Sequence, residues 1–359
     1  MTRDIPVEKL AKQEKDYVLI DVRSPGEYKE ATIPGAVNVP LFTDEERAEI
    51  GIAYKHRGQK EAKWQGMHLV SPKLPRLMEQ IKEHTTGKQP VVFCWRGGMR
   101  SLSMATFAQF SGLPVLRLTG GYRAYRQHVN EHLTAALLPD VLYVLHGMTG
   151  VGKTHILTQL AAWEQHVLDL EDYAGHRGSV FGSIGIEEKN QKMFDALLYE
   201  NLLEIKKNDD SYAYMEAESR RIGKIVLPEF LVEGKRKGIH FSVEAPLEVR
   251  VERLYEDYII PYQDKGWFIQ QVTEAFQAIA RRMETSARND CYRYLVERKY
   301  RLFIRTLLQT YYDPRYSHKE EEYEGEFIHV DASDIKQAAK QLMEYHADKK
   351  RKSKKARIS

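Results

Sequence analysis

The sequence predicts an α/β protein with two parallel-sheet units in succession, followed by a helical, basic region. Short apolar runs alternate with segments of helical character through the first two thirds of the chain, which is typical of strands joined by crossover helices. Two of these runs lead directly into glycine-bearing loops that suit anions, at Cys94 and at Gly147. From about Leu247 onward the pattern is mostly helical.

Length and composition agree with this organisation. A chain of 359 residues with 42% hydrophobic residues suffices for two packed cores, at roughly 150 residues per domain. We expect a first domain over 5–130, a second over 138–245, a helical region over 246–345 and a basic tail over 346–359.

The distribution of apolar residues, charges and cysteines argues against a membrane-spanning, zinc-binding or disulfide-rich protein. No run approaches the roughly 18 apolar residues of a membrane span, and 1–15 is charged without an apolar signal core, so we expect a cytoplasmic protein away from membranes. The net charge is only +3. Cys94 and Cys291 have neither the spacing of a zinc site nor the density of a disulfide framework, so we expect two reduced thiols, with Cys291 packed.

Apolar runs bounded by glycine and proline locate the expected strands. In the first domain they are 17–22, 36–41, 90–93 and 115–118. Ser101 is placed to cap a helix over 101–110, and 127–136 reads as a helical junction. In the second domain the expected strands are 141–145, 167–170, 213–215 and 239–243.

The loop Cys94-Trp-Arg-Gly-Gly-Met-Arg100 follows a strand directly and precedes a helix. Backbone N–H groups around Gly97 and Gly98, together with the helix dipole, form a nest for negative charge. Arg96 and Arg100 add positive charge, so the thiolate of Cys94 is favoured. These features favour a nucleophilic cysteine over a structural one.

The segment from Gly147 to Thr154 is a complete phosphate-binding loop between an apolar strand and a helix. Amides of the turn from Gly150 to Lys153 would wrap a phosphate chain, and the Lys153 side chain would reach its terminal groups. The hydroxyl of Thr154 would bind Mg²⁺ if a metal is used. The loop therefore predicts a site for a pyrophosphate-bearing ligand.

Two sets of acids could complete a metal site. Glu216 and Glu218 follow one strand, and Asp169, Glu171 and Asp172 follow another. Either set could hold the ion, and each acid could equally be a solvated charge at the end of a strand. The cationic segment 175–182 is glycine-rich, which fits both a loop closing over an anion and an ordinary surface loop.

The helical region combines cations with tyrosines at 292, 294 and 300, which suits an RNA backbone and unpaired bases. The basic residues at 349–357 point the same way. A solvated helix face and a solvated terminus are the alternatives. The arginines that we expect to contact RNA are Arg281, Arg282, Arg288, Arg293 and Arg298.

The first domain resembles the rhodanese family of sulfurtransferases in the segments 19–28, 33–40 and 118–122 around Cys94. In that family the loop cysteine carries a persulfide. Rhodanese loops are commonly one residue shorter, and the longer loop resembles members that admit a tetrahedral phosphorus oxyanion. This difference argues against a simple thiosulfate sulfurtransferase.

The order of the motifs along the chain resembles the tRNA 2-selenouridine synthase family over nearly the whole length. The resemblance rests on the cysteine loop followed by the phosphate-binding loop and on several connecting phrases. These phrases lie at 42–47, 51–55, 176–182 and 218–223. The fold that it implies is a rhodanese-like α/β domain, then a P-loop NTPase-like parallel-sheet domain with a helical, basic C-terminal region.

The resemblance implies replacement of sulfur by selenium in wobble 2-thiouridine of tRNA, with selenophosphate as donor. The resemblance also implies that an S-geranyl intermediate made from geranyl diphosphate precedes the selenium step. Cys94 would be the selenium-handling nucleophile, with Arg96, Gly97, Gly98 and Arg100 around the selenophosphate oxyanion. Lys153 and its loop would hold geranyl diphosphate rather than, or as well as, ATP. A selenophosphate-producing enzyme is an expected partner besides tRNA.

Two other functions remain open from the residues alone. The spacing of Cys94 and Arg100 also fits phosphatases that form a cysteinyl-phosphate. Together with the phosphate-binding loop it would suit a phosphatase–kinase fusion that acts on small molecules. A carrier that binds nucleotide and passes a persulfide to a partner protein is the third possibility.

Overall fold

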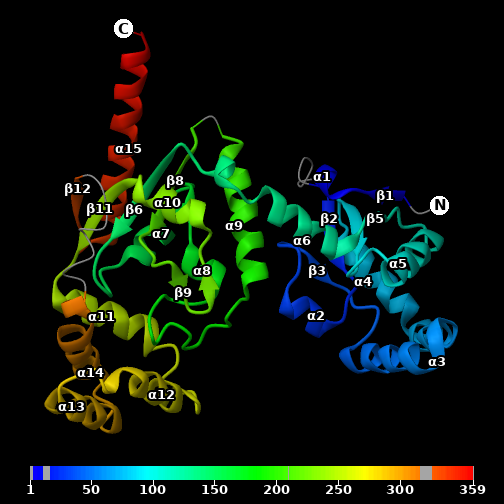
Figure 1. Ribbon diagram of the computed structural model, residues 1–359, viewed down its shortest axis with the longest axis horizontal. Coiled ribbons are helices and arrows are strands. Elements are labelled where there is room, and N and C mark those ends of the chain that lie inside the picture. Colours follow the sequence, from blue (N-terminus) through cyan, green and yellow to red (C-terminus); the bar gives the residue numbers. More distant parts are fainter. Residues whose placement is uncertain (1–2, 11–16, 209, 316–325, 359) are drawn as a thin grey trace. The chain divides into compact units, whose positions relative to one another are not determined.

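The computed structural model describes residues 3–10, 17–208, 210–315 and 326–358. The chain forms two compact units, shown in Figure 1. Unit 1 contains residues 1–133 and 192–200, and unit 2 contains residues 134–191 and 201–359. No helix in the described part of the chain combines the length and the apolar character needed to cross a membrane.

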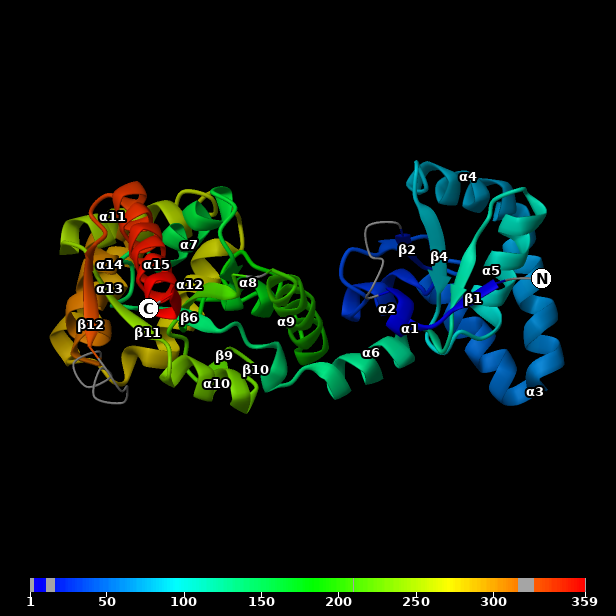
Figure 2. The same cartoon turned by 90° about the horizontal axis from the view of Figure 1, so that it is seen from above.

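Unit 1 contains a five-stranded parallel sheet in the order β1-β5-β4-β2-β3, which can be followed in Figure 2. Its strands are β1 (Arg3–Ile5), β2 (Tyr17–Asp21), β3 (Val37–Asn38), β4 (Gln89–Phe93) and β5 (Leu116–Leu118). All four strands expected here are present, although β3 covers only two residues of the expected 36–41. The edge strand β1 is too short to give a recognisable apolar run.

Helices connect the strands of unit 1. They are α1 (Val7–Leu10), α2 (Pro25–Glu30), α3 (Asp44–Val70), α4 (Leu74–His84), α5 (Met99–Phe110) and α6 (Gly121–His132), with the 3₁₀ turn η2 (Ser71–Lys73). The prediction that Ser101 caps a helix is wrong, because α5 begins at Met99 with Gly98 as its N-cap. The junction helix α6 also ends earlier than expected, and the turn η3 (Ala135–Leu137) follows.

Unit 2 contains a second five-stranded parallel sheet, in the order β12-β11-β6-β8-β7. Its strands are β6 (Val141–His146), β7 (Val167–Leu168), β8 (Tyr212–Glu216), β11 (Ile239–Glu244) and β12 (Phe327–Asp331). The helices and hairpin between them along the chain are α7 (Lys153–Ala162), α8 (Leu170–Ala174), α9 (Gln191–Lys206), β9 (Arg221–Ile222), β10 (Ile225–Val226) and α10 (Glu229–Arg236). Residues 192–200 of α9 belong to unit 1.

The region expected to be helical from residue 246 contains one strand. β12 pairs with β11 over Phe327–Asp331 and so completes the sheet of unit 2. The helices before it are α11 (Leu247–Tyr258), α12 (Phe268–Ala280), α13 (Thr285–Val296) and α14 (Tyr300–Leu307), which continues into the π turn η4 (Leu308–Tyr312) and the 3₁₀ turn η5 (Asp313–Arg315).

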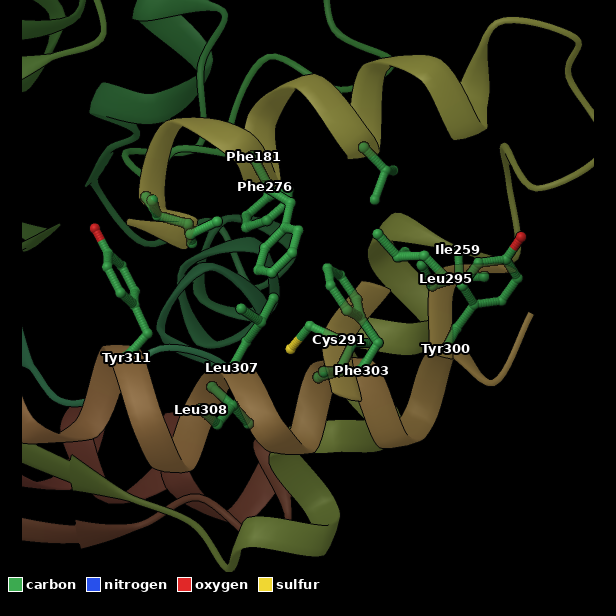
Figure 3. Close-up of a cluster of buried hydrophobic side chains, with 14 of the residues drawn as sticks. Phe181, Ile259, Phe276, Cys291, Leu295, Tyr300, Phe303, Leu307, Leu308 and Tyr311 are labelled. Carbon is green, nitrogen blue, oxygen red and sulfur yellow. The ribbon is translucent and has the colours of Figure 1, made fainter. Parts of the chain in front are cut away.

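These helices enclose an apolar core of their own, shown in Figure 3. Phe276 and Phe303 contact each other edge to face, with ring centroids 5.4 Å apart. Cys291 lies in this core with no exposed surface, and burial raises the pKa of its thiol to about 12. Cys291 is therefore a packed thiol, as expected, and is unreactive at neutral pH.

The basic end of the chain belongs to a helix. α15 (Ile335–Ile358) packs Ala338, Ala339 and Leu342 into the core of the second sheet and then continues, as Figure 1 shows in red. The boundary expected at residue 346 therefore falls inside α15. The basic residues prolong a helix that is already anchored on the sheet.

Candidate active sites

Cys94 lies at the carboxyl end of β4, immediately before the loop that leads into α5. Its side chain is buried, and its Sγ is 3.2 Å from the Oγ of Ser101. The Ser101 hydroxyl also lies 3.2 Å from the Gly98 carbonyl oxygen, to which it can donate. Ser101 is thus a neighbour of the thiol in the first turn of α5, a role that its reading as a helix cap had missed.

Gly120 and Gly121, directly after β5, pack against the backbone of this loop. The amide of Tyr122 donates to the carbonyl oxygen of Cys94, and that of Arg123 donates to the carbonyl oxygen of Trp95, both at 2.9 Å. Gly121 has a φ of +60°, and a Cβ there would lie 2.2 Å from the Cys94 carbonyl oxygen. Only glycine allows this approach of two backbones. The sequence showed the pair as the end of a strand.

The two loop arginines have different surroundings. Arg100 donates from Nη2 to Glu27 Oε1 at 3.2 Å, and Arg47 lies 2.9 Å from the same carboxylate. Burial alone would raise the pKa of Glu27, but hydrogen bonds and charge from Arg100 and Arg47 hold it below its usual value. Among the described residues Arg96 is exposed and makes no hydrogen bond or ion pair. Glu27 therefore orients Arg100, whereas Arg96 can turn toward a ligand.

The buried ion pair of Arg23 with Asp21 packs beside the residues that surround the cysteine loop. Arg23 is 2% exposed and its Nη2 donates to Asp21 Oδ2 at 2.6 Å. Its guanidinium lies 4.4 Å from the ring centroid of Tyr122, which in turn lies 5.6 Å from the ring of Trp95 in the cysteine loop. Removing one partner of such a pair leaves an uncompensated buried charge. Sequence reasoning gave Asp21 and Arg23 no site role of their own.

The phosphate-binding loop joins β6 to α7. Gly147, Gly150 and Gly152 all have positive φ, at 144°, 81° and 97°. Lys153, at the start of α7, donates from Nζ to the carbonyl oxygen of Gly147 at 3.0 Å. The loop lines a cavity of about 1380 Å³, large enough for a diphosphate ester and part of a larger substrate. The N-terminus of α7 lies at this loop and favours an anion there.

Two arginines of α11 donate hydrogen bonds to backbone carbonyl groups of the same loop. Arg250 donates from Nε to the carbonyl oxygen of Thr149 at 2.9 Å and pairs with Asp313 at 2.6 Å. Arg253 donates from Nη1 to the carbonyl oxygen of Val151 at 2.7 Å. Both arginines are buried. Sequence reasoning missed them, because cations on a helix usually form a solvated face.

Both candidate sets of acids contribute to one carboxylate cluster. Glu171, Glu216 and Glu218 bring carboxylate oxygens within 4.8 Å of one another. Thr154 donates from Oγ1 to Glu216 Oε1 at 2.7 Å. Hard oxygen donors of this kind are the ligands that Mg²⁺ prefers. The remaining acids have other roles, since Asp169 accepts from the amide of Asp172 as the N-cap of α8.

Without a cation, the carboxylates of this cluster are buried close to one another, which disfavours their charged forms. Burial, together with the neighbouring charges of Glu216 and Glu218, raises the pKa of Glu171 to about 9. Burial likewise raises the pKa of Glu216 to about 7, against the opposing charge of Lys153. At neutral pH the cluster therefore retains protons, which a divalent cation would displace.

The glycine-rich segment 175–182 forms part of the cavity wall. Arg177, Gly178 and Ser179 line the cavity. Arg177 lies over the ring of Tyr258, 4.6 Å from its centroid, and donates to the carbonyl oxygen of Ile184 at 3.3 Å. These contacts favour the reading of this segment as a ligand loop over that of a loose surface loop.

The arginines expected to contact RNA lie on and around α12 and α13. Arg281 and Arg282 are exposed, and Arg288 is half-buried. Arg293 pairs with Asp290 at 2.7 Å, and Arg298 follows α13 with a φ of +54°. Their contact with RNA stays a prediction.

We predict that Gly121→Ala destabilises unit 1 far more than Gly112→Ala. Both glycines have positive φ, which costs alanine about 1–2 kcal/mol, but nothing lies within 4 Å of a Cβ at Gly112. At Gly121 the Cβ would meet the Cys94 carbonyl, so the loop must move. Urea denaturation of both variants measures the difference. Equal losses would show that the two backbones are not in contact.

We also predict that Glu171→Gln reduces the pH dependence of stability in metal-free protein. The folded-state pKa is raised, so the stabilising contribution is complete below about pH 4.5 and is lost as the pH rises through about 9. From pH 5 to pH 9 the free energy of unfolding should fall by about 5 kcal/mol more in the wild type than in the variant. Exposed Glu274→Gln is the control, and parallel curves for wild type and Glu171→Gln would refute the assignment.

Comparisons with known proteins agree with this geometry. Residues 140–350 match the family described as tRNA 2-selenouridine synthase AAA domain, and residues 7–128 match the rhodanese-like domain. The tRNA 2-selenouridine synthase of Pseudomonas fluorescens is 32% identical over 86% of this chain and 90% of its own length.

Two further relatives have the same description. The protein of Bordetella bronchiseptica is 33% identical over 85% of this chain and 88% of its own length. That of Nitrosomonas europaea is 35% identical over 68% of this chain and 64% of its own length. The expected rhodanese-like and P-loop architecture is confirmed, and the chain belongs to the tRNA 2-selenouridine synthase family.

Proposed function

We propose that this chain replaces sulfur by selenium in wobble 2-thiouridine of tRNA, through an S-geranyl intermediate. Membership of the family supports the tRNA reaction. The observation that carries the geranyl step is an apolar cavity that opens beside the phosphate-binding loop of unit 2.

The apolar cavity has a volume of about 60 Å³. Figure 3 labels five of its lining residues, Phe181, Ile259, Phe303, Leu307 and Leu308. The last three lie on α14 and its continuation η4, and Phe181 and Ile259 come from two other segments of unit 2. The cavity shares several wall residues with the phosphate cavity: Thr149, Ser179, Leu254, Tyr258 and Tyr312. A ligand with a diphosphate on the P-loop would thus find a hydrocarbon surface next to it. That chemistry fits a prenyl diphosphate better than the polar edge of a nucleotide base.

In the first step the sulfur of 2-thiouridine attacks C1 of geranyl diphosphate. A C–S bond forms, the C–O bond to diphosphate breaks, and the N3 proton of the base leaves. The loop amides and Lys153 stabilise the departing diphosphate. Glu171, Glu216, Glu218 and Thr154 would hold Mg²⁺, which when bound neutralises part of the diphosphate charge.

In the second step Cys94 acts as a nucleophile on selenophosphate. Its thiolate attacks phosphorus, an S–P bond forms, the P–Se bond breaks, and selenide leaves. Selenide adds to C2 of the geranylated base, the C–S bond breaks, and geranyl thiol leaves. Water then hydrolyses the cysteinyl-phosphate to free phosphate. The loop amides around Gly97 and Gly98, with Arg96 and Arg100, would hold the oxyanion.

We expect Cys94→Ala to abolish formation of 2-selenouridine while geranylation continues. The nucleophile of the selenium step is lost, but the P-loop is intact, so the S-geranyl nucleoside should accumulate. Mass spectrometry of nucleosides from thiolated tRNA, incubated with geranyl diphosphate and selenophosphate, measures both products. The control is Cys291→Ala, since Cys291 lies in a separate core. Selenation at the wild-type rate by Cys94→Ala would rule out this role.

We expect Lys153→Ala to slow geranylation about 10²- to 10³-fold, because a donor to the leaving diphosphate is lost. Exposed Lys224→Ala, which removes a cation paired with Glu188, should leave the rate unchanged. The same nucleoside assay without selenophosphate isolates this step. Intact geranylation combined with lost selenation in Lys153→Ala would show that the P-loop does not hold geranyl diphosphate.

A further inference from the structure

We propose that the exposed face of α3 in unit 1 binds the tRNA beside the Cys94 loop. This inference rests on the proposed function, since it assigns a surface to the tRNA. It concerns a helix for which neither the sequence motifs nor the residues of the two loops gave a role.

Large side chains of α3 are exposed without a partner surface. Tyr54 is 59% exposed, Trp64 is 52% exposed and Met67 is 56% exposed. The buried residues of this 27-residue helix are only Ala53, Ala62, Gly66 and Val70. Trp64 and Met67 are three residues apart, so they lie on the same side of the helix and form an exposed apolar surface of the kind that binds a partner.

Cations alternate with these aromatic residues. From Tyr54 to His68 the sequence has Lys55, Arg57, Lys60 and Lys63 but a single acid, Glu61. Within the described part of the chain, the three lysines make no hydrogen bond or ion pair. Cations interleaved with exposed aromatic rings are typical of surfaces that track a nucleic-acid backbone and stack on unpaired bases. A protein partner would instead favour a contact centre depleted of charge.

The helix begins next to the cysteine loop. Arg47, in its first turn, lies 2.9 Å from the Glu27 carboxylate, and that carboxylate also pairs with Arg100 of the loop. At 1.5 Å per residue, Tyr54 lies about 10 Å further along the helix. The helix kinks at Gly58, where φ is 85° and ψ is 174°, before it reaches Trp64. A base at Cys94 would therefore have neighbouring nucleotides within reach of the α3 side chains.

Several arginines of the C-terminal helices are engaged in ion pairs, although Arg281 and Arg282 are exposed. Arg293 pairs with Asp290, Arg301 lies 2.6 Å from Glu252, and Arg305 pairs with Glu248. Tyr300 is buried in the helical core. Ion pairs and burial reduce what these side chains can offer to phosphates and bases. The free lysines and exposed rings of α3 have no such competition.

The test is the binding of a thiolated tRNA to the full chain by fluorescence anisotropy over a range of salt concentrations. Trp64→Ala should weaken binding about tenfold, since stacking on one base contributes that much. Lys→Gln at Lys55, Lys60 and Lys63 together should reduce the slope of log affinity against log salt by about 2 to 3. Phe110→Ala is the control, because Phe110 is 93% exposed at the end of α5.

The outcomes separate this inference from the proposed function. Losses confined to the α3 variants, with the control unaffected, would support the α3 surface. Wild-type affinity and slope in the α3 variants would overturn it and leave the tRNA reaction standing. A change in oligomeric state on Trp64→Ala without a change in tRNA binding would also overturn it and make α3 a protein interface. Failure of the wild type to bind any tRNA would overturn both.

Discussion

Both loops depend on a glycine that packs so closely against a backbone carbonyl oxygen that no side chain would fit. A Cβ at Gly121 would lie 2.2 Å from the Cys94 carbonyl oxygen, and a Cβ at Gly147 would lie 2.3 Å from that of Val243. In unit 1 this contact lies between the segments that follow β4 and β5. In unit 2 it lies between β11 and the segment that follows β6. In unit 1 the amides of Tyr122 and Arg123, which follow Gly121, donate to the carbonyl oxygens of Cys94 and Trp95 and so fix the cysteine loop.

Buried cations then hold the two loops in position. Arg23 stacks on Tyr122 below the cysteine loop, whereas Arg250 and Arg253 donate to carbonyl groups of the phosphate-binding loop. Their place in the fold explains why helix α11, which looks like a charged surface helix in sequence, is an essential wall of the second site.

Sequence patterns were sufficient for the strands that lead into each loop and for the loops themselves. β4 and β6 are apolar runs that end in glycine-rich segments, so local composition identifies them. β12 could not be predicted in this way. It pairs with β11, which lies more than 80 positions earlier in the sequence, and no local pattern indicates which strand it joins. The cluster of Glu171, Glu216 and Glu218 combines two candidate sets for the same reason. Periodicity also could not show that Gly121 supports Cys94.

The second unit combines the cavity at the phosphate-binding loop with an apolar cavity, and on this combination we base the proposal of a prenyl diphosphate rather than a nucleotide. Direct titration calorimetry of the wild-type chain with geranyl diphosphate, inorganic diphosphate and ATP tests it. If the apolar cavity takes the hydrocarbon tail, geranyl diphosphate should bind at least about tenfold more tightly than inorganic diphosphate, with a negative change in heat capacity. Equal affinity for the two, with tighter binding of ATP, would contradict the assignment of this site to geranyl diphosphate.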